Sequence, residues 1–175
     1  MRSLFLLSAI ILLSISCTQK QKVETKDPVL MSSNNTEIEQ WTNLYNIRKD
    51  SIARSGNSVA FINSEAIYSV GYSNTITNIS KTKIDSVIFS YWVFLKSDKA
   101  QAKTVLSIDD KSNGKNIFWA GNFFGEKVKE YNKWVKITET FKIPANIDPK
   151  YTLSIYVLNT SKEEILLDDF MATFY

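Results

Sequence analysis

The sequence predicts an antiparallel β-sandwich, and three observations indicate this fold class. After residue 37 the chain is dense in β-branched and aromatic residues, its apolar runs are short, and turn-forming residues separate those runs. Short strands at regular spacing, with turns between them, are typical of two-sheet sandwiches. We therefore expect one all-β domain over residues 37–175.

Residues 1–16 have the three-part layout of a secretory signal, with Arg2, an apolar run over residues 4–13 and small residues before Cys17. The apolar run is shorter than the roughly 20 residues of a membrane-spanning helix. This layout resembles bacterial lipoprotein signals, which implies that Cys17 carries lipid. Ser14 stands where that family prefers an aliphatic residue, and an ordinary cleaved signal with an incidental cysteine is the alternative.

Residues 17–36 are expected to be the lipidated N-terminus and a flexible tether, because they contain few large apolar residues and no sustained period. Random-coil scaling gives such a segment a reach of about 25 Å. The domain would then begin at residue 37.

Alternation indicates how the expected strands are buried. Over residues 134–143, Val135, Ile137, Phe141 and Ile143 share one face, while lysines and threonines share the other. Residues 88–95 are apolar or aromatic on both faces, which predicts a central strand. Helical turns are expected only at residues 37–44 and 127–131. The eight predicted strands cover residues 57–63, 74–80, 86–96, 102–109, 115–124, 134–143, 152–159 and 165–175.

Composition excludes several classes of function. The formal net charge of the chain is +3, and its lysine and glutamate residues are scattered along the sequence. A nucleic-acid partner is therefore not expected. The chain has no histidine and only one cysteine, which leaves almost no ligands for a transition metal. Any bound metal should therefore be a hard cation held by oxygen atoms.

Asp168 and Asp169 are adjacent carboxylates in an apolar strand, so one of them must point inward or lie at the strand end. A buried carboxylate is costly unless it is paired or coordinated. Two explanations stay open: a calcium ion shared with Glu39 or Glu37, or a hydrogen-bonded or salt-bridged aspartate. Adjacent carboxylates diverge and do not form a glycosidase pair, and no nucleophile-and-base motif accompanies them, so an enzyme is not expected.

Five aromatic residues are the candidate ligand-binding residues, because a ring can stack on the face of a sugar while Trp and Tyr also offer a polar edge. The strongest three candidates, Trp119, Phe123 and Tyr131, flank the loop-rich segment of residues 116–133. For each aromatic residue the alternative is core packing. The candidates are Trp119, Phe123, Tyr131, Tyr156 and Trp92.

The order of several short motifs resembles the galactose-binding-like jelly-roll domains of the carbohydrate-binding-module type. The motifs are the turn at Gly56, Tyr68-Ser69, residues 90–93, Trp134 with residues 140–144, residues 155–159 and residues 167–170. The resemblance implies a two-sheet jelly roll, a structural calcium ion at its rim, and sugar binding by aromatic residues. Arg54 replaces a histidine that is frequent in the family.

Such domains are frequent in lipoproteins of Bacteroidetes-like bacteria, which implies a cell-envelope location. We expect an outer-membrane lipoprotein, on the periplasmic face or the cell surface, that contacts the membrane through its lipid anchor alone. The expected function is non-catalytic carbohydrate binding by stacking and hydrogen bonds. The alternative is a module that binds or assembles with another envelope protein.

Overall fold

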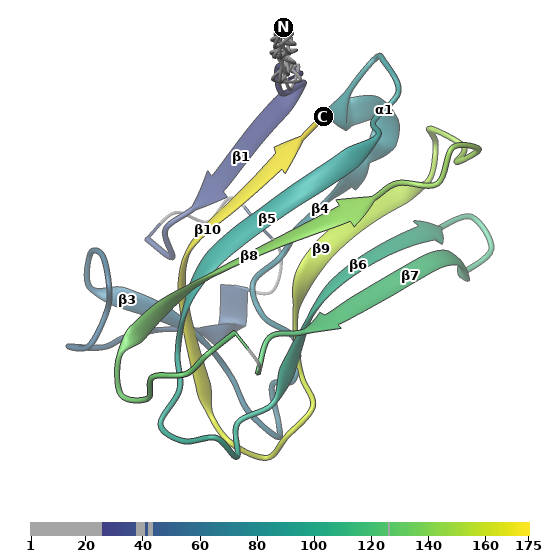
Figure 1. Ribbon diagram of the computed structural model, residues 1–175. Helices are drawn as coiled ribbons and strands as arrows, with labels where there is room; N and C mark the ends of the chain where they lie inside the picture. Colours follow the sequence, from purple (N-terminus) through teal and green to yellow (C-terminus); the bar gives the residue numbers. More distant parts are fainter. Residues whose placement is uncertain (1–25, 38–40, 42–43, 126) are drawn as a thin grey trace, which may run out of the picture.

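The computed structural model describes residues 26–37, 41, 44–125 and 127–175, and it confirms the all-β prediction (Figure 1). Two antiparallel sheets form a β-sandwich with a shared core. The predicted signal, Cys17 and Glu39 lie outside the described residues. Within the described residues, no helix has the length and apolar character needed to cross a membrane.

One sheet has six strands in the order β2-β3-β10-β5-β8, and β1 also pairs with β10. β1 and β3 occupy successive halves of the same edge of β10, where Leu30 pairs with Phe174 and Ile62 with Ile165. The strands are β1 (Leu30–Asn34), β2 (Ile47–Lys49), β3 (Ser58–Ile62), β5 (Ser86–Phe94), β8 (Trp134–Lys142) and β10 (Ile165–Phe174).

The other sheet has four strands in the order β4-β9-β6-β7. Two short helical segments complete the described fold: the 3-10 helix η1 (Leu44–Asn46) and the single turn α1 (Ile76–Ile79). The strands are β4 (Tyr72–Thr75), β6 (Ala102–Asp110), β7 (Lys115–Phe123) and β9 (Thr152–Asn159).

Three expected segments differ from the structure. Residues 30–34 were assigned to the tether but form β1, whose short and polar sequence gains order from backbone pairing with β10. The strand expected over residues 74–80 gives way to α1, because Ile76 and Ile79 have helical spacing and both point into the core. No helix forms among residues 127–131, and the helical turn expected at residues 37–44 lies partly outside the described residues, with η1 beginning at Leu44.

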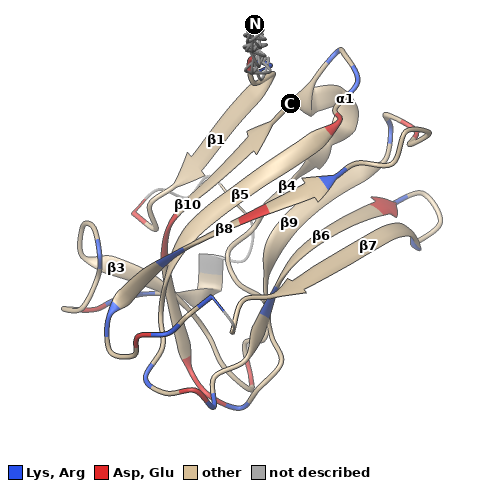
Figure 2. Ribbon diagram, viewed as in Figure 1, with Lys and Arg blue, Asp and Glu red and all other residues tan. Residues whose placement is uncertain are grey.

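The core contains a cluster of aromatic rings between the sheets. Phe89 and Tyr91 of β5 are fully buried, and their ring centroids lie 5.3 Å apart. Phe170 of β10 stacks on Tyr91 at 6.0 Å. On β8, Ile137 and Phe141 are buried as their alternation predicted. Most charged residues lie in loops and near strand ends (Figure 2).

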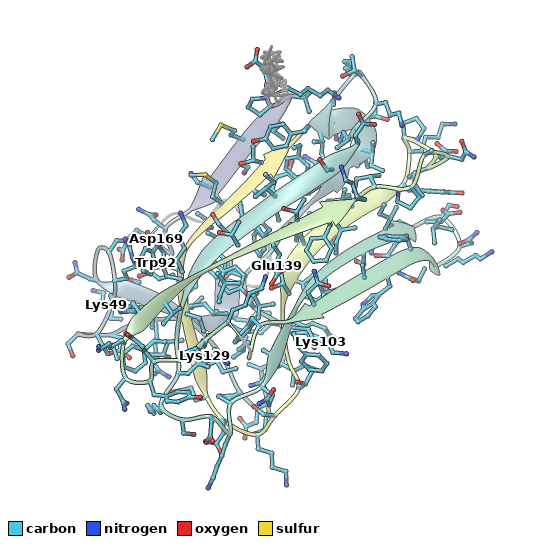
Figure 3. All side chains as sticks on the ribbon, in the orientation of Figure 1. Lys49, Trp92, Lys103, Lys129, Glu139 and Asp169 are labelled. Carbon is cyan, nitrogen blue, oxygen red and sulfur yellow. The ribbon has the colours of Figure 1, made fainter. Side chains whose placement is uncertain are left out.

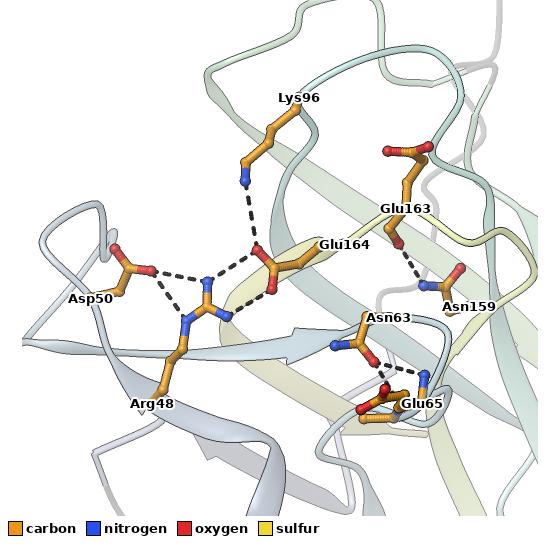
Figure 4. A network of polar contacts seen from close by, with 9 residues as sticks. Arg48, Asp50, Asn63, Glu65, Lys96, Asn159, Glu163 and Glu164 are labelled. Atoms are coloured by element: carbon orange, nitrogen blue, oxygen red, sulfur yellow. Dashed lines mark hydrogen bonds and ion pairs between the residues drawn. The ribbon is translucent and has the colours of Figure 1, made fainter.

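A polar network closes one edge of the six-stranded sheet (Figure 4). The Arg48 guanidinium donates to both carboxylate oxygens of Glu164, at 2.7 and 3.1 Å, and to Asp50 Oδ2 at 3.2 and 3.3 Å. Its hydrogen bonds to the Glu164 carboxylate hold the pKa of that group below its usual value. These contacts tie β2 to the loop that leads into β10.

Candidate functional site

The outer face of the four-stranded sheet carries the candidate site. On β6, Thr104, Leu106 and Ile108 point inward and are fully buried, so the residues between them point outward. Cross-strand pairing places Lys103 beside Phe123 and Ser107 beside Trp119, both on β7. On the other side of β6, Tyr156 of β9 pairs with Val105. The pairing register thus gathers residues from three strands on one face.

We call the set of Tyr68, Lys103, Trp119, Phe123 and Tyr156 the aromatic platform. Trp119 is 45% exposed, Phe123 is 54% exposed and Tyr68 is 44% exposed. Tyr68 joins the sheet through a bridge to Leu158, next to Tyr156. Large rings with this much exposure on a single sheet face are available to a ligand.

The position of Trp119 depends on the glycine two residues along β7. A Cβ atom built on Gly121 would lie 2.4 Å from Cη2 of the Trp119 ring and 3.0 Å from two further ring carbons. Real Cβ contacts are essentially never closer than 3.0 Å. The Trp119 ring therefore rests against the sheet surface in space that only a glycine leaves open.

The tyrosines extend the platform across the sheet. The Tyr68 and Tyr156 rings meet edge to face, with centroids 5.6 Å apart. Burial raises the pKa of the Tyr156 phenol, and side-chain hydrogen bonds to Trp119 and Ser107 partly offset that rise. Tyr156 thus connects the ring pair to Trp119.

Lys103 supplies a positive charge within the platform. Its ammonium nitrogen lies 4.4 Å from the Phe123 ring centroid and 5.5 Å from that of Trp119. These distances place it within the range of a cation–π interaction with both rings. The ammonium charge of Lys103 therefore lies close to both Trp119 and Phe123, the two most exposed rings of β7.

A hollow lies at each end of the platform. The first, of about 270 Å³, is lined by Tyr68, Ser73, Ser107, Asp109, Lys111, Ser154 and Tyr156. The second, of about 370 Å³, is lined by Gln101, Phe123, Gly125 and Lys129. A third hollow, of about 230 Å³, lies beside α1 away from the platform, and its lining includes Ile76, Ile84 and Leu153 but no aromatic ring.

The structure brings together three of the five predicted ligand-binding residues: Trp119, Phe123 and Tyr156. Tyr131 is 37% exposed, but it belongs to the loop between β7 and β8. Trp92 is half-buried on the outer face of the other sheet, with the Arg54 guanidinium 3.9 Å from its ring centroid. Figure 3 shows Trp92 and Lys103 on different parts of the sandwich.

Sequence reasoning missed Tyr68 and Lys103 as members of the site. The signal for Lys103 was its position on the outward face of an alternating strand, opposite an aromatic residue on β7. That signal becomes readable only when the β6-β7 register is known. Tyr68 lies outside the named strands and joins the sheet through a single bridge.

Asp168 is the inward-pointing carboxylate and is fully buried. Oδ2 accepts the backbone N–H groups of Arg54 and Ser55 at 3.0 and 3.2 Å, and Oδ1 accepts the Asp169 N–H at 2.8 Å and the Thr36 hydroxyl at 3.3 Å. Burial raises the pKa of the Asp168 carboxyl, and these backbone hydrogen bonds oppose the rise. Of the two explanations left open for the buried aspartate, hydrogen bonding is the one that its described surroundings support.

Asp169 points the other way, at a bulge where the β10-β5 register shifts. Its carboxylate pairs with the Arg54 guanidinium and accepts the Ser55 hydroxyl at 2.6 Å. The described residues contain no group of three acidic, histidine or cysteine side chains that could hold a metal. Of the two glutamates offered as calcium ligands, Glu37 accepts the Asn57 N–H at 2.7 Å, and Glu39 lies outside the described residues. Calcium stays a prediction.

No protein-family model matches the sequence, and no curated protein matches it. Solved structures do match. The chain is similar to the CBM22-1 xylan-binding domain from Paenibacillus barcinonensis Xyn10C, with 19% identity and a TM-score of 0.50, over 85% of this chain and 94% of that one.

The chain is also similar to the C-terminal family 22 carbohydrate-binding module of Clostridium thermocellum Xyn10B, with 16% identity and a TM-score of 0.53, over 81% of this chain and 92% of that one. A further xylan-binding domain of family 22 matches with 14% identity and a TM-score of 0.55, over 81% and 92% of the two chains. These likenesses confirm that the chain has the jelly-roll fold of carbohydrate-binding modules.

Proposed function

We propose that the aromatic platform binds a carbohydrate chain and that the protein performs no chemistry on it. The observation that carries this proposal is the Trp119 ring, which lies over Gly121 on an open sheet face with 45% of its surface exposed. A ring held in this way can stack on the apolar face of a pyranose. Immobilisation before binding lowers the entropic cost of the contact.

Hydroxyl groups beside the rings supply the polar part of recognition. Ser107 and Ser154 line the hollow next to Tyr156, and the Ser73 and Ser154 hydroxyls lie 2.8 Å apart. These groups can both donate to and accept from sugar hydroxyls. An apolar protein-docking patch would not need such interleaved hydroxyls, so this surface favours a sugar over an envelope protein. The xylan-binding domains that share the fold support the same proposal.

The test is the Trp119→Ala variant, with affinity measured by titration calorimetry against a soluble xylan and a panel of other glycans. We expect at least about a thirtyfold loss of affinity, because truncating an anchoring aromatic residue costs roughly 2 kcal/mol or more. Tyr131→Ala is the matched control, since it removes an exposed ring outside the platform. Unchanged glycan binding by a folded Trp119→Ala protein would contradict the proposal.

We also propose that lipid on Cys17 holds the protein at the cell envelope. The supporting observation is the sequence layout: a short apolar run, small residues, and the only cysteine of the chain at the polar boundary. A lipidated Cys17 would fractionate with membranes, and Cys17→Ser would release the protein into the soluble fraction. Mass spectrometry of the wild-type N-terminus would detect the added lipid, and an unmodified Cys17 would contradict the proposal.

A further inference from the structure

We propose that the glycan bound by the platform is anionic, with a carboxylate or sulfate group held at the Phe123 end. This inference rests on the proposed carbohydrate-binding function and adds the charge class of the ligand. It starts from two lysines, Lys103 and Lys129, which lie next to Phe123. Figure 3 labels both lysines in the lower half of the view.

Neither lysine forms an ion pair with a carboxylate among the described residues. Other lysines in the region are paired: Lys127 lies 2.7 Å from Glu139, and Lys133 lies 3.2 Å from Glu130. Within the described part of the chain these two ammonium groups have no carboxylate partner, and they place positive charge around the exposed Phe123 ring. A ligand that stacks on this ring would bring its substituents within reach of that charge.

The two ends of the platform differ in the groups that they offer. The hollow beside Tyr156 has serine hydroxyls together with Asp109, and Lys111 lies 3.6 Å from the Asp109 carboxylate. That end suits the uncharged hydroxyls of a sugar ring. The hollow beside Phe123 is lined by Lys129 and Gln101 and by no carboxylate among the described lining residues. An ammonium group only donates, so its best partner is an anionic acceptor.

A carboxylate on the sugar, or a sulfate ester, would meet this requirement. Stacking on Phe123 would also exclude some water, which strengthens the attraction between the ligand anion and Lys103. An exposed ion pair of this kind raises affinity by about two- to fivefold and weakens with salt. We therefore expect the protein to prefer an anionic glycan over a neutral glycan with the same backbone.

The experiment compares glucuronoxylan, which has a uronate substituent, with neutral arabinoxylan by titration calorimetry at low and high salt. A sulfated dextran forms a third arm and distinguishes sulfate from carboxylate. The variants are Lys103→Gln, Lys129→Gln and their combination. Lys49→Gln is the matched control, since it removes one positive charge from β2, which belongs to the other sheet.

We expect Lys129→Gln, which lies outside the platform, to lose about two- to fivefold of its affinity for the preferred anionic glycan and to keep its affinity for arabinoxylan. The double variant should lose about four- to twenty-five-fold for the anionic glycan, as two exposed ion pairs would predict, and much less for arabinoxylan. Lys49→Gln should change neither affinity. Equal wild-type affinity for anionic and neutral glycans, unchanged by the lysine variants, would overturn this inference and leave the proposed function intact. Absence of binding to every glycan would overturn both.

Discussion

At the residue scale, the contact between Trp119 and Gly121 sets the geometry of the proposed binding surface. Gly121→Ala would place a methyl group where the Trp119 ring now lies, so the ring must lift from the sheet. We expect affinity for a bound glycan to fall about three- to tenfold, the size of a lost aromatic contact. The melting temperature should change little, because Trp119 lies on the sheet surface, 45% exposed, and is not part of the core cluster.

A double variant separates this effect from general damage to β7. If Gly121→Ala acts through the ring, it should cause no further loss of affinity in a Trp119→Ala background. An additional loss of similar size in that background would contradict the assignment. Calorimetric titration of the four proteins completes the cycle.

Asp168 is the second residue whose surroundings make a sharp prediction. In Asp168→Asn an amide NH₂ must face either the Arg54 and Ser55 N–H groups or the Asp169 N–H. Facing donors leave buried groups unsatisfied, so we expect a loss of about 1 to 3 kcal/mol in the free energy of unfolding. Urea unfolding measures this loss, with Asp98→Asn on an exposed loop as the control.

The same protein tests the calcium prediction. If an ion binds near Asp168, calcium should raise the melting temperature of the wild type, a chelator should reverse the rise, and Asp168→Asn should abolish it. A wild-type melting temperature that is indifferent to calcium and to chelator would reject calcium. The hydrogen bonds from residues 54, 55, 36 and 169 would then account for the buried charge alone.

At the scale of elements, Glu139 joins the edge strands of the two sheets. It lies on the inner face of β8 and is 5% exposed. Its carboxylate accepts from Lys127 Nζ at 2.7 Å and from Asn122 Nδ2 of β7 at 3.2 Å. The loop between β7 and β8 is thereby fixed beside the platform.

Removing the cation would leave the Glu139 carboxylate buried with the Asn122 amide as its single side-chain donor among the described residues. We expect Lys127→Met to lower the free energy of unfolding by about 1 to 2 kcal/mol, less than for a fully buried pair because Lys127 is half-exposed. The loss should shrink in a Glu139→Gln background. Lys136→Met, on the outer face of β8, is the control, and an equal loss there would contradict this account.

The same scale explains what the sequence could predict. Local alternation identified the core face of β8, because side-chain direction in a strand follows from sequence alone. The apolar residues on both faces of β5 indicated an interior strand, and β5 lies between β10 and β8. The stacking chemistry of aromatic side chains identified Trp119, Phe123 and Tyr156 as candidates. Their meeting on one face depends on the β6-β7 and β6-β9 registers, which join distant parts of the chain.

Other features were hidden for related physical reasons. β1 contains too few apolar residues to stand out, and its order comes from pairing with the far end of the chain. Glu139 occupies an inward position that its charge made improbable, and Lys127 and Asn122 are the residues of the described chain whose side chains compensate for its burial. Contacts with distant parts of the chain thus determine the order of β1 and the burial of Glu139, which the local sequence pattern does not show.

At the scale of the whole molecule, residues before position 37 that the sequence assigned to the tether pack against the sandwich. β1 covers half of one edge of β10, and the Thr36 hydroxyl donates to the Ser58 carbonyl at 2.7 Å. The Lys26 ammonium also lies 2.9 Å from the Asp85 carboxylate. These contacts bind the segment before residue 37 to the sandwich.

A chain that begins at residue 26 should therefore match the full-length protein in melting temperature. A chain that begins at residue 37 should melt several degrees lower, since it leaves the β10 edge unpaired and lacks the apolar contact of Leu30 with the core. Differential scanning calorimetry of the two chains makes the comparison. Equal melting temperatures would show that β1 contributes nothing to stability.

The position of β1 has a mechanical consequence. If the protein is anchored through residues before Lys26 while its platform binds a polymer, a pulling force on the polymer would act on the fold at the start of β1. A pull along the strand axis strains all five β1-β10 residue pairs in shear, whereas a sideways pull peels them one after another. Under force, the first event would then be detachment of β1, with the β6-β7-β9 surface still intact and attached to its polymer.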